Sequence, residues 1–377
     1  MRIAFAIPGD IDTPTGGYRY DRRILAELRA AGHEVGHVVL NGGFPDPLPE
    51  EAEAAIATLA ALEADAVLVD GLAFSALPVE GLRSVRAPLV ALIHHPLALE
   101  TGLSPAAAAA HRSRETAALT AAAGVVVTSE PTRDTLLADY AVPPDRIDVA
   151  VPGLDPSWFQ QRDPSPEGDA VPLIVSVGSI ISRKGHDVLL DALGRLMDHP
   201  WRAVVIGSKT WDSSLTAALE RQISHLGGRA SLAGALSEED IRAHYRAASV
   251  FSLATRYEGF GMVFLEAMAS GLPVVGTRGG AVPSVVPDSA GLLVDVDDPA
   301  ALAAALRRVL TEPAFAARLS HGAREAARSA TSWAESAALI ARRLEAASRA
   351  PASHSATPSA AGDGTAPSAT PTQTVLS

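Results

Sequence analysis

The sequence of 377 residues contains no cysteine. This absence excludes disulfides, thiolate catalysis and Cys-ligated zinc, although it does not fix the compartment. The chain also lacks any uninterrupted run of about 18 apolar residues, so we expect no transmembrane helix. Its first apolar run, "RIAFAI", is too short for the core of a signal peptide and is typical of a strand. We expect a soluble, cytoplasmic protein.

Positive charge is scarce, because 31 Lys and Arg residues face 43 Asp and Glu residues and the net charge is -12. Nucleic-acid-binding proteins normally carry a basic surface, so we expect no nucleic-acid partner. Arg83 and Arg86 are too few for a polybasic membrane patch, which needs about four or more charges. An anionic ligand must therefore be bound by local basic groups and by backbone amides.

Short apolar runs without polar alternation are separated by helical stretches, a pattern typical of a parallel sheet covered on both faces. The pattern occurs twice, with expected strands at 2–7, 34–40, 66–70, 89–93, 124–129 and 147–151, and again at 172–178, 202–207, 230–234, 249–254, 273–277 and 291–295. A chain of this length exceeds one ordinary core. We predict an α/β protein of two Rossmann-like, doubly wound domains, 1–165 and 166–330, facing each other across a cleft. A helix at 331–349 and a disordered tail at 350–377, rich in Ser, Thr, Ala and Pro, should follow.

Two of the loops that follow strands have the composition of anion-binding sites. Gly16 and Gly17 precede a helix whose amide groups and dipole would favour an anion, and an ordinary tight turn explains them equally well. Their spacing is not G-x-G-x-x-G, which argues against a dinucleotide. Arg183 and Lys184 would neutralise a diphosphate, one as a planar fork and the other as a point charge. Taken alone, they are more simply a solvated basic pair.

The stretch "RYEGFGMVFLEAMASG" (256–271) carries two acids, Glu258 and Glu266, on either side of a glycine-bracketed turn and an apolar run. Gly259 and Gly261 let backbone amides approach a phosphate closely. A carboxylate accepts from two vicinal hydroxyls at once, which suits a ribose. We predict one acid for a sugar, the other for a ribose, and amides between them for phosphates. The alternative for Glu266 is a helix-surface glutamate, which its apolar neighbours disfavour.

Four stretches, "TGGYRYDRRILAELRAAGHEV", "RKGHDVLLDAL", "YEGFGMVFLEAMASGLPVV" and "GLLVDVDDPAALAAAL", together resemble the family-4 glycosyltransferases, retaining enzymes of GT-B fold. The resemblance covers nearly the whole chain except the tail, and the Glu-x7-Glu element is its most specific part. It implies that Arg183 and Lys184 contact the diphosphate of a nucleotide sugar and that Glu266 binds the ribose. The transferred sugar and its phosphate would be held by Glu258, Gly259, Phe260 and Gly261. Gly16 and Gly17 would close on the diphosphate, and the helix at 331–349 would pack back on the N-terminal domain.

The stretch "PLVALIHHPLALE" also matches the family, which implies a histidine near the anomeric region of the sugar. Alignment from Pro88 assigns this role to His94 rather than His95, with a buried, hydrogen-bonded histidine as the alternative. The implied catalytic set is Glu258, His94, Lys184 and Arg183. Many relatives carry arginine where this chain has Ser179, so either one diphosphate contact is missing or Arg183 supplies it.

No Asp-x-Asp motif stands at a strand end, and "DVDDP" (295–299) fits a helix N-cap better than a metal site. We therefore expect no metal ion and no cofactor besides the nucleotide-sugar co-substrate. Tyr20, Asp21 and Arg22 are acceptor-side candidates, with an ordinary helix surface as the alternative.

The predicted function is retaining, metal-independent transfer of a sugar from a nucleoside-diphosphate sugar to a hydroxyl of a small molecule, glycan or lipid. A nucleotide-sugar epimerase of the same fold and a non-catalytic nucleotide-sugar-binding protein are the alternatives. The sequence does not determine the sugar, the nucleotide, the acceptor or the oligomeric state.

Overall fold

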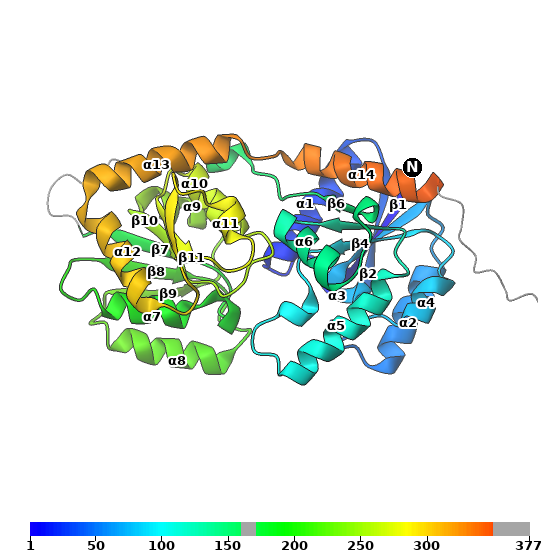
Figure 1. Cartoon of the computed structure of the whole chain (residues 1–377), viewed down its shortest axis with the longest axis horizontal. Helices are drawn as coiled ribbons and strands as arrows, with labels where there is room; N and C mark the ends of the chain where they lie inside the picture. The colour runs from blue at the N-terminus through cyan, green and yellow to red at the C-terminus, as the bar shows by residue number, and fades with distance from the viewer. Residues whose placement is uncertain (160–170, 350–377) are drawn as a thin grey trace, which may run out of the picture.

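The structure, a computed structural model, describes residues 1–159 and 171–349 of the chain. It contains two six-stranded sheets, each wholly parallel and each covered by helices on both faces (Figure 1). The prediction of two Rossmann-like domains is therefore confirmed. The tail at 350–377, for which we expect disorder, and the centre of the linker lie outside the described residues.

The N-terminal sheet has the strand order β2-β1-β3-β4-β5-β6. Its strands are β1 (Arg2–Pro8), β2 (Glu34–Leu40), β3 (Ala66–Asp70), β4 (Leu89–Ile93), β5 (Gly124–Val127) and β6 (Ile147–Val149). The helices of this half are α1 (Gly16–Ala30), α2 (Pro49–Ala60), α3 (Gly71–Phe74), α4 (Val79–Ser84), α5 (Pro105–Leu119) and α6 (Glu130–Asp139). Strands β3, β4 and β5 are buried at every residue, as expected for central parallel strands.

The C-terminal sheet has the order β12-β11-β10-β7-β8-β9. Its strands are β7 (Leu173–Val177), β8 (Arg202–Ile206), β9 (Ala230–Gly234), β10 (Val250–Leu253), β11 (Val274–Thr277) and β12 (Gly291–Val294). The helices are α7 (His186–Gly194), α8 (Ser213–Ser224), α9 (Glu238–Ala247), α10 (Met262–Ala269), α11 (Val282–Val285), α12 (Pro299–Thr311) and α13 (Pro313–Arg328). Both sheets change strand order at their first strand, and loops that follow the carboxyl ends of parallel strands are where such folds bind ligands.

The strands lie where the sequence predicts them, and six of the twelve (β5, β6, β7, β8, β10 and β12) end one or two residues earlier than the apolar runs. The run at 124–129 shows the reason: Thr128 and Ser129 are buried, but the Ser129 side chain accepts a hydrogen bond from the Thr132 amide and begins α6. Ser129 keeps an extended backbone, as N-cap residues do, but its side chain and its carbonyl oxygen both accept hydrogen bonds from amides of α6. The capping interaction therefore ends the strand although the residues remain buried.

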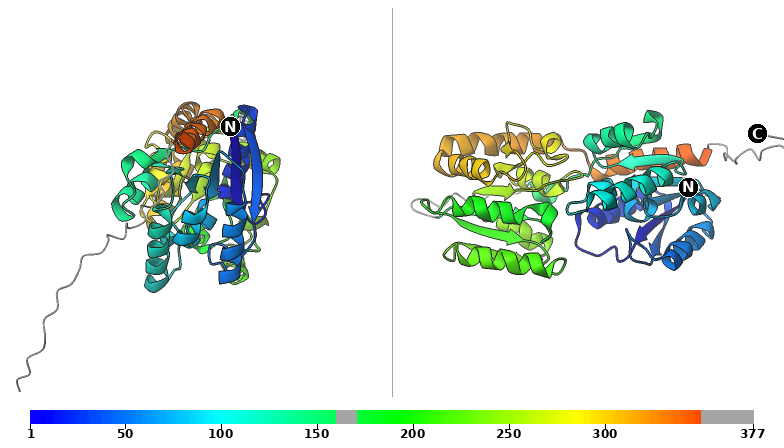
Figure 2. Two further views of the ribbon diagram at one scale, coloured as in Figure 1. Left: turned by 90° about the vertical axis from the view of Figure 1, so that its right-hand side faces the viewer. Right: turned by 60° about the horizontal axis from the view of Figure 1, so that its bottom comes forward.

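The last helix, α14 (Trp333–Arg349), leaves the C-terminal domain and lies on the N-terminal one. Both further views also place it beside the first strands of the chain (Figure 2). Its buried residues Ile340 and Leu344 belong to the same apolar cluster as Phe5 of β1 and Leu28 of α1. The end of the chain thus completes the core of the first domain.

Leu344→Ala is expected to lower the free energy of unfolding of the N-terminal domain by about 2–5 kcal/mol, because a buried leucine is replaced by a cavity. Urea unfolding followed by circular dichroism measures the change. Arg342→Ala, at an exposed position of the same helix, is the matched control and should change stability by less than about 0.5 kcal/mol. Equal, small effects of both substitutions would show that α14 does not stabilise this core.

Candidate functional site

The loop after β7 brings Lys184 to the cleft through a short 3-10 turn, Ser182–Lys184, that ends at Gly185. Gly185 has a φ of 62°, and a Cβ there would lie 1.9 Å from the carbonyl oxygen of Ala254. Only glycine fits a left-handed conformation with so close a neighbour. Gly185 therefore lets the chain turn sharply from the basic pair into α7 while this loop packs against the end of β10.

Lys184 and Glu258 form a buried ion pair between this loop and the loop after β10. The Lys184 ammonium donates to Glu258 Oε1 at 2.7 Å, and the two side chains are 14% and 7% exposed. Burial lowers the pKa of Lys184, whereas the two neighbouring cations outweigh burial and lower the pKa of Glu258. Each charged group therefore depends on the other for its place in the interior.

Arg183 spans the cleft between the two domains. Its Nε donates to Glu100 Oε1 of the N-terminal domain at 3.1 Å, and its Nη1 donates to the carbonyl oxygen of Tyr257 at 2.9 Å. Nη1 also lies 3.6 Å from Glu258 Oε2. Despite the burial of Glu100, His95 and Arg183 lower the pKa of its carboxyl to about 2. Arg183 thus points into the cleft and not towards solvent.

The glycines of the "EGFG" turn let backbone segments of both domains meet. A Cβ at Gly259 would lie 2.1 Å from the carbonyl oxygen of His94, across the cleft. Gly261 has a φ of 96° and precedes α10 directly, and Phe260 between them packs partly buried against the C-terminal core. The lack of a side chain at Gly259 therefore lets this turn approach the backbone of the N-terminal domain closely.

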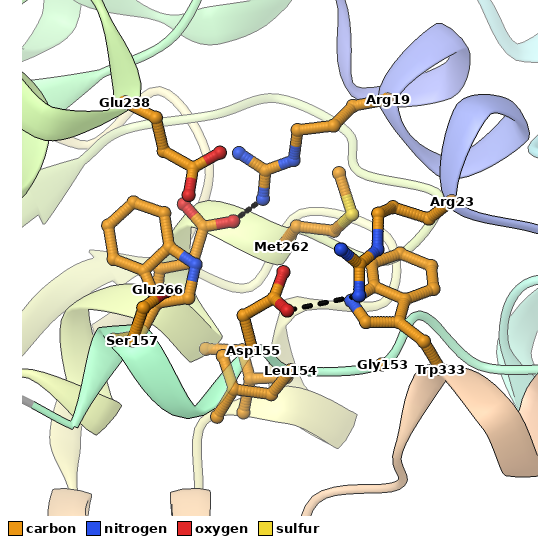
Figure 3. A pocket seen from close by; sticks show the side chains of 12 residues that line it. Arg19, Arg23, Gly153, Leu154, Asp155, Ser157, Glu238, Met262, Glu266 and Trp333 are labelled. Atoms are coloured by element: carbon orange, nitrogen blue, oxygen red, sulfur yellow. Dashed lines mark hydrogen bonds and ion pairs between the residues drawn. The ribbon is translucent and has the colours of Figure 1, made fainter. Parts of the chain in front are cut away.

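Glu266 is buried inside α10, and it forms an ion pair with Arg19 from the first turns of α1. The pair lies at a pocket of about 280 Å³ between the domains, where Figure 3 shows the two side chains pointing toward one another. The pocket is lined by charged, apolar and backbone groups from both domains and the connecting segment: Arg19, Arg23, Gly153, Leu154, Asp155, Ser157, Trp158, Glu238, Met262, Leu265, Glu266 and Trp333. The helix-surface alternative for Glu266 is therefore wrong.

His94, directly after β4, faces two carboxylates of its own domain. Its Nε2 lies 3.1 Å from Asp21 Oδ1 and 3.3 Å from Asp70 Oδ2. Among residues 1–159 and 171–349 these three are the one group of acidic and histidine side chains close enough together to hold a metal ion. Hydrogen bonds through a shared proton account equally for the two distances. The structure carries no ion, so our expectation of a metal-free site stays a prediction.

The first two turns of α1 border the cleft, but Tyr20 and Asp21 are not exposed as the acceptor-side surface that we considered. Tyr20 and Asp21 are fully buried, and the Tyr20 hydroxyl donates to the carbonyl oxygen of Ala150 at 2.8 Å. Arg22 donates to the carbonyl oxygen of Ile11. The helix-surface alternative is equally wrong for Tyr20 and Asp21. Gly17, in contrast, lies against the His94 ring, where a Cβ would be 3.5 Å from Cδ2.

The predicted site residues fall into two neighbouring groups. Arg183, Lys184, Glu258 and the Gly259–Gly261 turn meet at one end of the cleft with Gly17 and His94, and Glu266 lies at the pocket beside Arg19. Their roles towards a ligand stay predictions. Sequence reasoning missed Arg19, Asp70 and Glu100, which pair with predicted residues. Asp70 ends an apolar strand, a signal that would have marked it as a candidate at the ligand-binding edge.

Sequence models of known families match both halves of the chain. A sequence model of the group 1 glycosyl transferases matches residues 159–326, and one of glycosyltransferase family 4 matches residues 14–158. Together the two models cover both domains. The chain belongs to the family-4 glycosyltransferases. The resemblance inferred from the motifs is therefore confirmed.

Two relatives of this family-4 glycosyltransferase have curated names. A D-inositol 3-phosphate glycosyltransferase of Corynebacterium kroppenstedtii is 31% identical over 56% of this chain and 51% of its own length. An MMP alpha-(1->4)-mannosyltransferase of Mycolicibacterium hassiacum is 32% identical over 67% of this chain and 63% of its own length. The matched region thus spans between about half and two thirds of each relative.

Solved structures of other proteins share the fold. A sucrose-phosphate synthase of Thermosynechococcus elongatus superposes with a TM-score of 0.77 at 23% identity, covering 91% of this chain and 98% of the other. The Anabaena protein HepE, solved with UDP-glucose, has a TM-score of 0.73 at 19% identity and covers 92% and 99%. Within the described parts of this family-4 chain, no helix combines the length and the apolar character needed to cross a bilayer.

Glu258→Gln is expected to destabilise the C-terminal domain of this glycosyltransferase by about 3–5 kcal/mol, because it leaves the buried Lys184 without its carboxylate. Lys184→Met in the same background should recover part of the loss. A double-mutant cycle from urea unfolding, followed by tryptophan fluorescence, measures the coupling. Glu239→Gln, at an exposed position of α9, is the control for the chemical change. Losses that add within about 0.5 kcal/mol would contradict an energetic pair.

Proposed function

We propose that the protein is a retaining glycosyltransferase that moves a sugar from a nucleoside-diphosphate sugar to a hydroxyl group. The observation that carries the proposal is the cationic pair Arg183 and Lys184 held against Glu258 beside glycine amides, next to a pocket that contains a second buried carboxylate, Glu266. Cations and amides suit a diphosphate, and a buried carboxylate suits a ribose diol. The spacing of these groups along one cleft matches one elongated ligand.

For a donor to bind, Glu266 must exchange its ion pair with Arg19 for contacts to the ribose. Arg19 occupies the carboxylate that the ribose would use, and the two residues belong to different domains. A movement that separates the domains opens this pair and the Arg183–Glu100 pair together. Closure over the donor then excludes water, which would otherwise hydrolyse it. We infer that the ion pairs across the cleft are replaced by contacts to the donor and re-form after product release.

The reaction breaks the bond between the anomeric carbon and the diphosphate oxygen and forms one to the acceptor oxygen. The acceptor hydroxyl attacks on the face that the diphosphate vacates, and its proton passes to a phosphate oxygen of the leaving group. Arg183, Lys184 and the amides at Gly259 and Gly261 stabilise the negative charge that develops there. These cations supply the stabilisation that a metal ion gives in other enzymes, which supports a reaction without metal or cofactor.

The N-terminal domain would provide the acceptor side, around His94 and the loop that contains Glu100. A relative named for D-inositol 3-phosphate and another named for mannosyl transfer support a small hydroxylated acceptor over a lipid. The fold shared with HepE, solved with UDP-glucose, supports a hexose donor. With a soluble nucleotide sugar and acceptor, the cytoplasm is the compartment that we propose.

Replacement of Glu266 tests the donor site. Glu266→Gln should weaken the binding of the matching nucleoside diphosphate roughly tenfold or more, because hydrogen bonds to a charged group contribute about 1.5–3 kcal/mol. Calorimetry with UDP, GDP and ADP on the wild type selects the nucleotide, and Glu239→Gln is the control. Unchanged affinity in a variant that melts like the wild type would remove Glu266 from the nucleoside site.

Turnover tests the cationic pair. Lys184→Ala and Arg183→Ala should each lower kcat about a hundred- to a thousandfold with a smaller effect on donor affinity, because the leaving-group charge grows in the transition state. We expect comparable losses, since Arg183 points into the cleft. Mass spectrometry of sugar-nucleotide mixtures with acceptor pools identifies the donor and the product. Arg195→Ala is the surface control. Near wild-type kcat in both folded variants would mean that the diphosphate binds elsewhere. Isomerisation of the donor without transfer to an acceptor would favour an epimerase.

A further inference from the structure

His94 lies in a buried cluster with two aspartates, Asp21 and Asp70. Asp21, on α1, has no exposed surface, and its Oδ1 contacts His94 Nε2 while its Oδ2 has no hydrogen-bond partner among the described residues. Asp70, at the end of β3, uses Oδ1 to accept from the Leu72 amide and turns Oδ2 to the same ring nitrogen. Two carboxylates from different elements thus converge on Nε2 of one imidazole.

Charge balance at this point requires a proton on the ring. A neutral imidazole that turns its Nε2 lone pair to two carboxylates would face repulsion from both, and Nε2 must therefore carry a hydrogen. Two negative charges beside one buried ring further favour the cation over the neutral ring. His94 is 19% exposed, whereas both carboxylates are almost wholly covered. Protein groups therefore surround the Nε2 edge of the ring, and part of the ring remains exposed.

The other groups around the ring do not counter this effect. The Tyr20 ring stands edge-on to His94 at a centroid distance of 5.3 Å, and Gly17 packs against Cδ2. The titratable side chains that act on this group, besides the two carboxylates, are Tyr18, Tyr20 and His95. Burial raises the pKa of Tyr18 to about 12, and burial lowers the pKa of His95. All three are therefore neutral near pH 7–9, and the charge on His94 is set by Asp21 and Asp70.

We propose that Asp21 and Asp70 are positioning residues that hold His94 as an imidazolium with Nε2 turned into the N-terminal domain, so that Nδ1 is a hydrogen-bond donor to the substrates and not a general base. The substrate side of this inference rests on the proposed function. In that setting Nδ1–H donates to an oxygen of the transferred sugar or of the acceptor. The acceptor proton then has to leave through the donor phosphate, because His94 already carries its full number of protons.

The titration of the pair agrees with this geometry. Burial acts to lower the pKa of His94, but Asp21 and Asp70 outweigh it and raise the pKa to about 10. Burial raises the pKa of the Asp21 carboxyl to about 7 against the opposing effect of His94. A histidine with a raised pKa is protonated below that value and loses its proton only as the pH rises through it. Between pH 7 and 9 the ring is therefore cationic, and the Asp21 carboxyl is ionised in the upper part of this window.

The test uses the full-length protein with ¹⁵N-labelled histidines and long-range ¹H–¹⁵N spectra between pH 6 and 9.5. His94→Gln identifies the His94 signals. In the wild type they should keep imidazolium shifts over the whole range. In Asp21→Asn, which removes the charge and keeps the shape, the pKa of His94 should fall by at least one unit, and it should also fall in Asp70→Asn. Asp139→Asn, an exposed aspartate of the same domain, should change nothing.

A wild-type His94 that titrates near 6.5 would overturn the proposal. This measurement needs no variant, so the proposal can be tested even if Asp21→Asn does not fold. An unchanged His94 pKa in both folded variants would overturn it as well. Stoichiometric metal in the purified wild type that is lost in Asp21→Asn would also overturn the proposal, because it would show that a metal ion and not a proton lies between His94 and the two carboxylates.

Once a donor is known, the pH dependence of kcat tests whether the charge on His94 matters for turnover. Wild-type kcat should stay flat from pH 7 to 9, whereas Asp21→Asn should lose at least about twofold in kcat as the pH rises over this range, with donor KM little changed. A parallel pH profile in both proteins would contradict the role of the charge in catalysis. The spectra need no donor, so a failure of the proposed glycosyl transfer and a failure of the histidine network give different results.

Discussion

The buried ion pair of Lys184 and Glu258 is the interaction on which the arrangement of the C-terminal loops depends. Neither charge would be stable in the interior alone. Glu258 is in turn fixed by its backbone, because its carbonyl oxygen accepts from the Ala281 amide at 2.9 Å and a Cβ at Gly280 would lie 2.3 Å from that oxygen. The loops after β7, β10 and β11 therefore hold one another through this residue. Any ligand bound there meets a surface that is already organised.

The two domains are joined where two chain segments cross beside each other. Leu154 donates its amide hydrogen to the Thr331 carbonyl oxygen at 3.2 Å, and the Ser336 hydroxyl donates to that of Val151 at 2.6 Å. A Cβ at Gly153 would lie 2.2 Å from the Trp333 nitrogen, so only glycine permits this approach. The crossing lies at the edge of the pocket that contains Glu266.

Much of the fold was predictable because the strands of a parallel sheet are continuous apolar runs, and these signals are local in the sequence. The turn with Glu258 and Glu266 was predictable for the same reason, since both acids and the glycines lie within one short stretch. The partners of the site residues were not. Asp70 reaches His94 through strand pairing, and Glu100 reaches Arg183 through the meeting of two domains. Such contacts depend on tertiary geometry, which cannot be deduced from the spacing of residues along the chain.

The basic groups of the candidate site are each paired with an acid, in a chain with a net charge of -12. The pairs are Lys184 with Glu258, Arg183 with Glu100, Arg19 with Glu266, and His94 with Asp21 and Asp70. Two of them cross the cleft, and in the proposed mechanism they separate with the domains and free a cation or a carboxylate for the donor. The other two pairs each lie within one domain and do not depend on closure of the cleft. In the proposed reaction, the pair that opens at Glu266 frees a carboxylate for the ligand, and Arg183, once released from Glu100, joins Lys184 in stabilising the leaving diphosphate.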